Sequence, residues 1–454
     1  MYVYGAAAAL AASFLVVAFF VNSRGATLNE HSRDLSGSAG LAWLRRWRML
    51  GLARALSLGA LLLCIASGLF GTRSPYANIN MTLFWIVFLL GCTYLTALAG
   101  DFYALVNPWR VLGDGLTRAF GNDGRGRMKY PRRLGYWPAL LFYMALIWLE
   151  LFGAVQPHSL ALILLAYSGI NLFGVWLFGS QDWFRYCEFL GVFLRLVGKM
   201  APLDYVPAQD RPAAARLRLR APFVGVLEEP VENLGLLVFA LFMLSSTAFD
   251  GARETVPWLN FFWRDLFGLL KPWVGNNPIT AFPLLRTVYL WAQGLILAAS
   301  PFIYLGVYLA FIALAKSITR SALGLRELAL RFGYTLLPIA LVYNITHYYT
   351  LLITQGVKII PLASDPFGLG WNLFGTAGWL RAPIIPDAGV VWHTQVALIV
   401  FGHIVSVYLA HVEALRTFRT RREATLSQLP MLLLMMVFTT TGLWILAQPI
   451  KGGM

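Results

Sequence analysis

Charged residues are scarce in this sequence. Only 13% of its 454 residues are Asp, Glu, Lys or Arg, whereas about 25% is usual in a soluble domain. Hydrophobic residues make up 58% of the chain. This composition excludes an ordinary soluble domain with a charged surface, and it indicates a chain that faces lipid.

Cysteine and the common catalytic motifs are also rare or missing. The three cysteines, Cys64, Cys92 and Cys187, are too few for a disulfide framework, and we interpret them as small buried hydrophobic residues. The chain has no GxxxxGK(S/T) phosphate loop, CxxCH haem-attachment motif, GxSxG nucleophile elbow or DxDxDG calcium loop. Any site must therefore be built from residues dispersed along the chain.

Long apolar runs recur from end to end. Each run has about 20 residues, which is enough for a helix to cross about 30 Å of hydrocarbon. No linker or internal repeat divides the chain, so the sequence predicts an all-α, polytopic membrane protein with one integral membrane domain, residues 1–454. The ten predicted spans are about 1–22, 49–71, 80–100, 134–153, 159–180, 231–249, 283–315, 332–354, 390–411 and 429–448.

The net charge of +15 follows the predicted topology. Five alternate loops carry 27 of the 36 Lys and Arg residues, namely 23–48, 101–133, 181–230, 316–331 and 412–428. Loops rich in Lys and Arg stay on the cytoplasmic side, so both termini are expected outside. The charge therefore predicts a lipid bilayer as partner and gives no indication of nucleic acid.

One cytoplasmic segment, residues 183–199, has the pattern of an amphipathic helix. Its charged residues Arg185, Glu188, Arg195 and Lys199 fall within about 80° of one another on a helical projection. The remaining residues are mostly apolar or aromatic. We expect an interfacial helix that lies on the cytoplasmic surface of the membrane.

An outer loop, residues 364–379, is rich in turn residues. It begins with Asp365-Pro366 and contains closely spaced glycines, which favour tight turns over helix. Such loops often cover a binding site, and Asp365 and Trp371 are its candidate ligand contacts. A purely structural re-entrant loop is an equal alternative.

Two of the six histidines, His347 and His403, fall in the middle of long apolar stretches that we predict to be spans. An ionisable side chain at membrane depth is costly and points to a functional site. At 1.5 Å per residue, His347 lies roughly 10 Å below the outer surface and His403 near the midplane. His393 lies near the outer end of the same span as His403. His411 is too far along that helix to share a metal ion with His403, since zinc–nitrogen distances are about 2.1 Å.

Acidic residues gather at the same outer level as His347. Glu150 ends the fourth predicted span, and Asp250 follows the sixth. Carboxylates and imidazoles converging on a half-buried pocket could bind a divalent metal ion that activates water, relay protons, or hold a substrate. The structural alternative is that Glu150 pairs with Arg253 or Arg286 and that Asp250 caps a turn. A haem with His347 and His403 as axial ligands also stays open.

Several segments together resemble bacterial multi-pass membrane proteins of the fenitrothion hydrolase (organophosphate hydrolase-like) family. They include GDFYALVNPWRVL at 100–112, STAFDG at 246–251, RFGYTLLPIALVYNITHYYTLLITQG at 331–356, SDPFGLGWNLFGTA at 364–377 and VALIVFGHIVSVYLAH at 396–411. The resemblance covers nearly the whole chain. It implies a protein of the bacterial inner membrane that hydrolyses a phosphotriester-like bond, in complex with a related membrane subunit.

The sequence therefore predicts a membrane-embedded hydrolase with its site in the outer half of the bilayer. The candidate catalytic residues are Glu150, Asp250 and His347. The candidate ligands of a divalent metal ion such as zinc are His347, His403 and Asp250, and the candidate substrate contacts are Asp365, Trp371 and His393. The alternative is a non-enzymatic protein, either a transporter or a membrane subunit, whose histidines relay protons or serve a haem- or quinone-linked site.

Overall fold

The fold is predominantly helical in the part of the chain that the structure describes. The computed structural model describes residues 32–38, 49–119, 126–206 and 216–448, together with residues 7 and 11. Eight segments within these ranges are long and apolar enough to cross a membrane. This confirms the prediction of an all-α, polytopic membrane protein. The predicted span 1–22 lies outside the described residues, apart from residues 7 and 11.

Most predicted spans correspond to one long helix each. The second span in the described part has a π-helical middle, Thr82–Gly91, between α4 (Ile79–Met81) and α5 (Cys92–Ala99). The other spanning helices are α3 (Met49–Phe70), α9 (Pro157–Phe178), α12 (Leu234–Arg253), α15 (Pro278–Thr319), α17 (Leu337–Thr354), α19 (Ala388–Thr417) and α20 (Arg421–Ala447). The predicted span 134–153 forms α8 (Trp137–Phe152), whose 16 residues are fewer than the about 20 that a straight crossing needs.

Shorter elements connect these helices. They are α6 (Tyr103–Val106), α7 (Pro108–Ala119), α10 (Ser180–Tyr186), α11 (Phe189–Gly198), α13 (Val256–Asn260), α14 (Phe267–Val274), α16 (Leu325–Phe332) and α18 (Ile359–Ser364). A small antiparallel sheet has the strand order β1 (Arg33–Asp34), β3 (Arg216–Leu219), β2 (Leu203–Val206). Leu219 of the central strand pairs with Arg33 on one side and with Leu203 on the other.

The segment 183–199 differs from the single surface helix that its charge pattern predicts. It breaks at Cys187 and Glu188 into α10 and α11. Glu188 caps α11 by accepting hydrogen bonds from the backbone N–H groups of Leu190 and Gly191, and only 1% of it is exposed. Tyr167 and Asn107 donate to the same carboxylate. The prediction was wrong because a cap inside the protein satisfies this charge, so the segment packs into the core.

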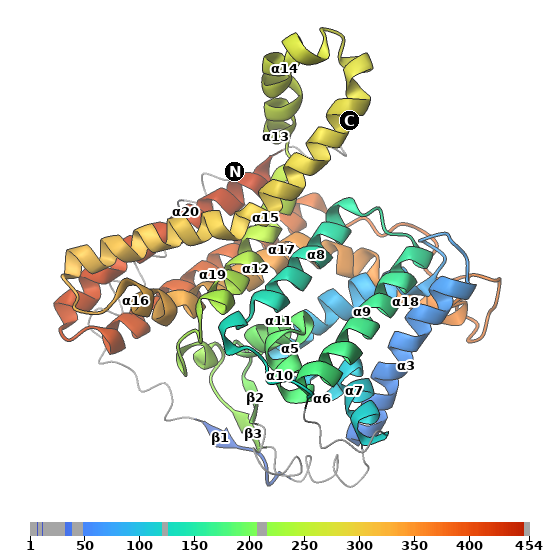
Figure 1. Ribbon diagram of the computed structural model, residues 1–454, viewed down its shortest axis with the longest axis horizontal. Helices are drawn as coiled ribbons and strands as arrows, with labels where there is room; N and C mark the ends of the chain where they lie inside the picture. Colours follow the sequence, from blue (N-terminus) through green and yellow to red (C-terminus); the bar gives the residue numbers. More distant parts are fainter. Residues whose placement is uncertain are drawn as a thin grey trace.

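Helix α12 occupies the centre of the molecule (Figure 1). Its sequence LGLLVFALFMLSSTAF is mostly apolar on every side, as expected of a helix surrounded by other helices or by lipid. Here other helices surround it, since residues 235–250 are all buried. It packs against α8, α15 and α17, while α17, α19, α20 and α15 lie side by side along the long axis. This arrangement brings the polar end of α12 against the middle of α17.

Pro338 and Pro301 affect their helices in different ways. Pro338 lies in the first turn of α17, where a helix needs no backbone donor, so it begins the helix without breaking it. Pro301 lies inside α15 and leaves the carbonyl of Leu297 without its helical donor. The hydroxyl of Ser300 donates to that carbonyl at 2.9 Å, and it lies 2.9 Å from the hydroxyl of Ser245 on α12.

A glycine sets the close approach of α17 and α19. A Cβ atom added to Gly402 of α19 would lie 2.1 Å from Cγ2 of Val342 on α17. Real non-bonded carbon atoms do not approach so closely, so only glycine fits at this crossing. The close approach lets the two helices pack along the face that leads to His347.

Candidate functional site

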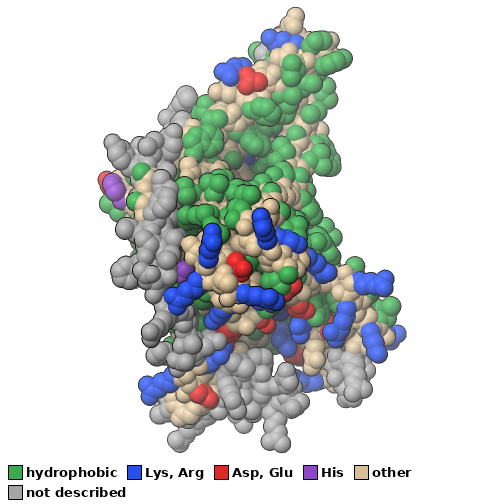
Figure 2. All heavy atoms as spheres, turned by 90° about the vertical axis from the view of Figure 1, so that its left-hand side faces the viewer, with side chains coloured by type: hydrophobic (Ala, Val, Ile, Leu, Met, Phe, Trp, Pro, Cys, Tyr) green, Lys and Arg blue, Asp and Glu red, His purple; other side chains and the backbone are tan. Residues whose placement is uncertain are grey.

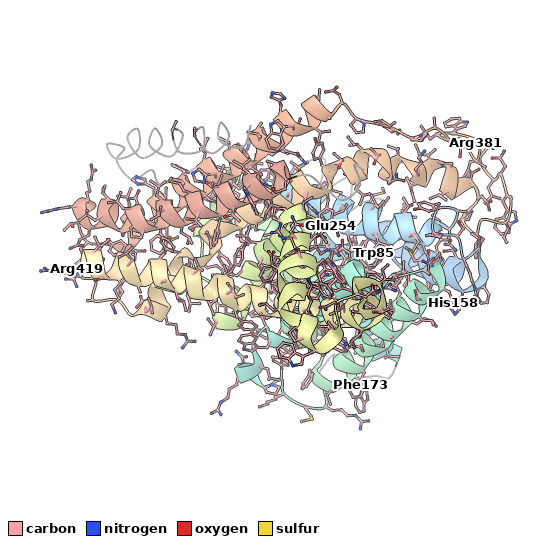
Figure 3. The ribbon with its side chains drawn as sticks, turned by 90° about the horizontal axis from the view of Figure 1, so that it is seen from above. Trp85, His158, Phe173, Glu254, Arg381 and Arg419 are labelled. Atoms are coloured by element: carbon pink, nitrogen blue, oxygen red, sulfur yellow. The ribbon has the colours of Figure 1, made fainter. Side chains whose placement is uncertain are left out.

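A cavity of about 310 Å³ lies between the span 79–99, α8, α11, α12 and α17. This volume is at the lower end of the range for small-molecule sites, about 300–1,000 Å³. Aromatic side chains such as Trp85, Phe88 and Phe193 form much of its wall. Trp85 lies well inside the molecule in the view from above, whereas Arg381 and Arg419 mark its opposite ends (Figure 3). The polar wall residues are Thr93, Tyr143, Glu150, Ser246, Thr247, Asn344 and Tyr348.

Glu150 provides the charge on this wall. It comes from the last turn of α8, and its side chain is exposed to the cavity. Tyr348 is its hydrogen-bonding neighbour, and Asp250 and Arg253 are the nearby charges. Among the described residues, no ion pair includes Glu150. An accessible carboxylate inside a largely apolar cavity is free to exchange a proton or to meet a ligand.

Asp250 lies near Glu150, and both of its carboxylate oxygens have partners. One of its oxygens, Oδ2, lies 2.8 Å from Nε2 of His347 and accepts a hydrogen bond of 2.9 Å from the hydroxyl of Tyr348. The other oxygen accepts from Nε of Arg253 at 3.1 Å. The side chain of Asp250 is only 12% exposed. A buried carboxylate needs such partners, because an unpaired charge in an apolar interior costs several kcal/mol.

The guanidinium of Arg253 has an acceptor at each nitrogen. Besides Asp250, the carbonyl of Leu151 accepts from Nη1 at 3.4 Å, and Glu254 lies 3.2 Å from Nη2. Arg253 therefore compensates Asp250 and Glu254. This differs from the structural alternative in which Arg253 or Arg286 pairs with Glu150. Asp250 likewise is no turn cap, because α12 continues to Arg253.

Helix α17 presents two polar side chains to the cavity from one face. Asn344 and Tyr348 are four residues apart, and Leu351 follows three residues later, so all three point the same way. The side-chain oxygen of Asn344 is buried and has no hydrogen-bond partner in the described part of the chain. His347 lies on the neighbouring face of the helix and turns to Asp250. The cavity wall thus combines an amide, a phenol and the carboxylate of Glu150.

The predicted catalytic residues lie together in space. Asp250 and His347 are in direct contact, and Tyr348 stands between Asp250 and Glu150. Only Glu150 of the three predicted residues lines the cavity. Their catalytic role stays a prediction, but their common location follows from the packing of α8, α12 and α17.

The predicted metal ligands His347, His403 and Asp250 do not form a ligand set. Across residues 49–119, 126–206 and 216–448, no group of three or more His, Cys, Asp or Glu side chains could hold a metal ion. His403 is completely buried and lies 2.9 Å from the hydroxyl of Thr439 on α20. Asp250 is already surrounded by Arg253, His347 and Tyr348. The metal expected from the sequence therefore has no matching donor set in this part of the chain.

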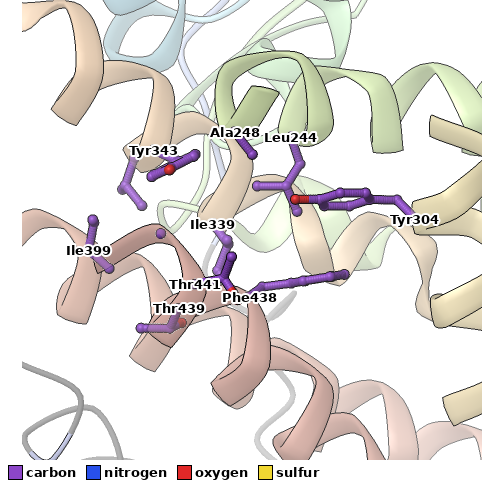
Figure 4. Close-up of a pocket in the computed structure, with 11 residues that line it drawn as sticks. Leu244, Ala248, Tyr304, Ile339, Tyr343, Ile399, Phe438, Thr439 and Thr441 are labelled. Atoms are coloured by element: carbon purple, nitrogen blue, oxygen red, sulfur yellow. The ribbon is translucent and has the colours of Figure 1, made fainter. Parts of the chain in front are cut away.

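A second cavity, beside Thr439, is very small (Figure 4). It measures about 20 Å³ and lies between α12, α15, α17, α19 and α20. That volume is close to what one water molecule needs. Neither this cavity nor the larger one is lined by His347 or His403, so these two histidines do not fit the axial positions of a haem.

The predicted substrate contacts lie away from the large cavity. The carboxylate of Asp365 accepts hydrogen bonds from the backbone N–H groups of Leu369 and Gly370 and so fixes its own loop. Trp371 is 43% exposed and packs on Phe367. His393 is exposed, with its ring bonded to the carbonyl of Gly389. None of the three predicted contacts lines the cavity.

Sequence reasoning missed Tyr348, Asn344 and the aromatic wall around Trp85. One signal could have found the first two. The run YNITHYY places Asn344 and Tyr348 one helical turn apart within an apolar span, and polar residues with that spacing share a face. Trp85 and Phe88 had no such signal, because aromatic residues are frequent throughout the chain.

Known proteins give no support for the expected family. No family model matches the chain, and no curated protein or solved structure is significantly similar to it.

Proposed function

We propose that the protein is a membrane-embedded hydrolase, and that Glu150 is the general base for water attack on a small, largely apolar ester of the phosphotriester type. The observation that carries this proposal is the accessible carboxylate of Glu150 in a cavity of about 310 Å³. The likeness of the sequence motifs to fenitrothion hydrolases supports the choice of substrate class.

In the proposed reaction, a water molecule in the cavity gives a proton to Glu150 while its oxygen attacks the phosphorus atom. The bond from phosphorus to the leaving alcohol or phenol breaks, and that oxygen takes the proton from Glu150. Water must be oriented for such a step, and the unpartnered oxygen of Asn344 offers a second acceptor for it. Tyr348 donates its proton to Asp250 and lies beside Glu150, so it fills the space between the two carboxylates.

The test is hydrolysis of an aryl dialkyl phosphate that releases a coloured nitrophenolate. Glu150→Gln should lower turnover by roughly 100-fold or more, since a general base contributes about 10²–10⁴-fold. Glu254→Gln is the matched control, because Arg253 lies near both carboxylates but Glu254 does not line the cavity. Equal turnover of the wild type and Glu150→Gln would refute the role of Glu150.

A second candidate is a proton-coupled transporter of organic cations. The observation that favours it is the excess of hydrogen-bond acceptors on the cavity wall. Among the residues that the structure describes, Glu150 has no ion pair and the oxygen of Asn344 has no donor, while the hydroxyl of Thr93 already donates to the carbonyl of Leu89. An ammonium group would satisfy both acceptors, and aromatic faces such as that of Trp85 would stabilise its charge.

Binding of phenethylamine and of phenethyl alcohol separates the two candidates. A cation site binds the amine at least about tenfold more tightly than the alcohol, because a charge-assisted hydrogen bond is worth roughly 1.5–3 kcal/mol. A site that binds neither compound but turns over the phosphotriester supports the hydrolase. Uptake of the amine into proteoliposomes, driven by a proton gradient, would establish the transporter.

We further propose that the protein lies in a bacterial inner membrane with both termini outside, alongside a related membrane subunit. The segregation of Lys and Arg into alternate loops supports this orientation. Ala382→Cys and Ala322→Cys place single probes in two loops predicted to face opposite sides, and both positions are exposed. A membrane-impermeant maleimide on intact cells should label the first and spare the second; the reverse result would invert the topology.

A further inference from the structure

Two connections between helices form one end of the molecule. Helix α15 ends at Thr319 before α16, and α19 ends at Thr417 before α20. Because α15 and α20 pack against each other along their lengths, the two connections lie side by side. Figure 2 faces this end and shows Lys and Arg side chains gathered around it, next to a broad hydrophobic surface.

The positive charge here is not neutralised. Six arginines in the two connections and in the adjoining helix turns are exposed, and we call them the arginine end: Arg320, Arg326, Arg416, Arg419, Arg421 and Arg422. Among the described residues, none of the six forms an ion pair. Like charges this close repel one another, so a bound anion would stabilise the arrangement.

The carboxylates in the same region already have ion-pair or hydrogen-bond partners. Glu327 pairs with Arg331 at 3.2 Å, and Glu413 is buried and accepts from the hydroxyl of Thr417. Glu423 accepts from the backbone N–H of Thr420 in the capping box that begins α20. These three carboxylates therefore already have partners, and the Lys and Arg residues of this region outnumber them.

The backbone at Arg320 adds an independent observation. Its φ angle is +47°, in the left-handed region that favours glycine. The residue terminates α15 by donating its N–H to the carbonyls of Lys316 and Ser317. Arginine occupies this position at a cost in backbone energy that glycine would avoid, and this places a guanidinium at the rim of the membrane-facing surface.

An exposed apolar strip leads away from the arginine end. On α15, Leu314 and Ile318 are 46% and 42% exposed, and on α20, Leu429 and Leu433 are 53% and 48% exposed. Each pair is spaced four residues apart, so its members share a face. This strip has the character of a surface that contacts acyl chains, directly beside guanidinium groups.

We propose that the arginine end binds the headgroups of anionic phospholipids, whose acyl chains lie on the apolar strip. Arginine matches the phosphate group through paired N–H donors. The neighbouring strip distinguishes a lipid from an acidic protein, which would need no acyl-chain surface. The bound lipid neutralises the arginine end and anchors the connections at the membrane surface.

The test is titration of the purified full chain in neutral detergent with phosphatidylglycerol or phosphatidylcholine, followed by native mass spectrometry. The wild type should bind phosphatidylglycerol preferentially. The triple variant Arg320→Gln/Arg421→Gln/Arg422→Gln should lose at least about tenfold in affinity, given roughly 1 kcal/mol for each basic residue. Arg381→Gln at the opposite end is the matched control and should bind like the wild type.

Two outcomes would overturn the proposal. One is equal binding of phosphatidylglycerol by the triple variant and the wild type. The other is equal protection against thermal unfolding by inorganic phosphate and by phosphatidylglycerol, which would show a phosphate site that makes no use of the apolar strip. Catalytic turnover is a separate measurement, so failure of the hydrolase proposal leaves this result unaffected.

Discussion

The imidazole of His347 on α17 lies 2.8 Å from the carboxylate of Asp250 on α12. The contact joins two helices that both supply the wall of the cavity, and it is only partly shielded from solvent, since 22% of the His347 side chain is exposed. Arg253 completes the charge balance from the last turn of α12. The site is thus held by a network of four side chains, with Tyr348 as the member that reaches the cavity.

Replacing Asp250 should destabilise the protein. Asp250→Asn removes the negative charge that Arg253 and His347 face, and breaking a buried pair in this way costs about 3–5 kcal/mol. Thermal unfolding in detergent, followed by tryptophan fluorescence, measures the change. Asp265→Asn is the control, because the pair of Asp265 with Arg264 is exposed and should contribute little to stability. Similar shifts for both variants would contradict the buried network.

Tyr348→Phe should reduce catalysis without a comparable loss of stability. The change deletes the hydroxyl that stands between Asp250 and Glu150, so the carboxylate of Glu150 loses its orienting neighbour. We expect turnover of a phosphotriester to fall about tenfold to 100-fold. Tyr349→Phe tests specificity, because Tyr349 bonds the carbonyl of Val391 and lies outside the cavity. A larger effect of Tyr349→Phe would argue against the assigned site.

The stability of the protein should depend on pH through Asp101, which lies just beyond the end of α5. Burial raises the pKa of its carboxyl to about 6, against the opposing effects of the Ala104 N–H group, Arg195 and Arg110. Between about pH 4 and 6 the folded chain keeps a proton that the unfolded chain releases, so stability falls as the pH rises through this window. Asp101→Asn should remove this part of the slope.

The midpoint of thermal unfolding, measured from pH 4 to 8 for both chains, checks this dependence. The stability of the wild type relative to Asp101→Asn should decrease up to about pH 6 and then level off. Glu327→Gln, a change in an exposed pair on α16, should leave the slope unaltered. A difference between wild type and Asp101→Asn that does not vary with pH would rule out this titration.

Gly402→Ala should loosen the packing of α17 on α19. The new methyl group would lie 2.1 Å from Cγ2 of Val342, and relieving such an overlap costs typically 1–3 kcal/mol. The control is Gly306→Ala on α15, where nothing lies within 4 Å of the added atom. That change should be neutral or slightly stabilising, since alanine favours a helix.

Shortening Val342 should restore part of the loss. In the double variant Gly402→Ala/Val342→Ala, both γ-methyl groups of Val342 are gone, and the added methyl group at position 402 then lies no closer than 3.0 Å to the side chain at position 342. The unfolding midpoint should therefore lie closer to that of Val342→Ala than simple addition of the two effects predicts. Additive effects would mean that the overlap at this crossing is relieved by movement of the backbone.

The sequence predicted the helices well because their signal is local. A run of about 20 apolar residues needs no knowledge of its neighbours, and α3, α9 and α12 lie close to where their runs predict them. Segment 183–199 failed for the opposite reason. Its charges follow a helical period, but Glu188 accepts hydrogen bonds from Tyr167 and Asn107 outside the segment, and these contacts depend on the tertiary fold.

The site was predicted in part for the same physical reason. Depth along a helix can be counted from sequence, so Glu150, Asp250 and His347 could be placed at one level. The rotation of each helix about its own axis, which decides whether a side chain faces the cavity, cannot be counted from the sequence for three separate helices. His403 therefore entered the expected metal site, although its ring turns to Thr439, and Tyr348 was passed over, although it faces the cavity.

The pairing of β1 with β3 delays formation of the small sheet during synthesis of the chain. Arg33 and Asp34 pair with residues more than 180 positions later in the chain. At a synthesis rate of about 5–20 residues per second, β1 waits roughly ten seconds or longer for its partner. Helices α3, α8 and α9 lie between the two strands in the sequence, so all three are synthesised during that interval. The sheet can therefore form only after these helices have been made.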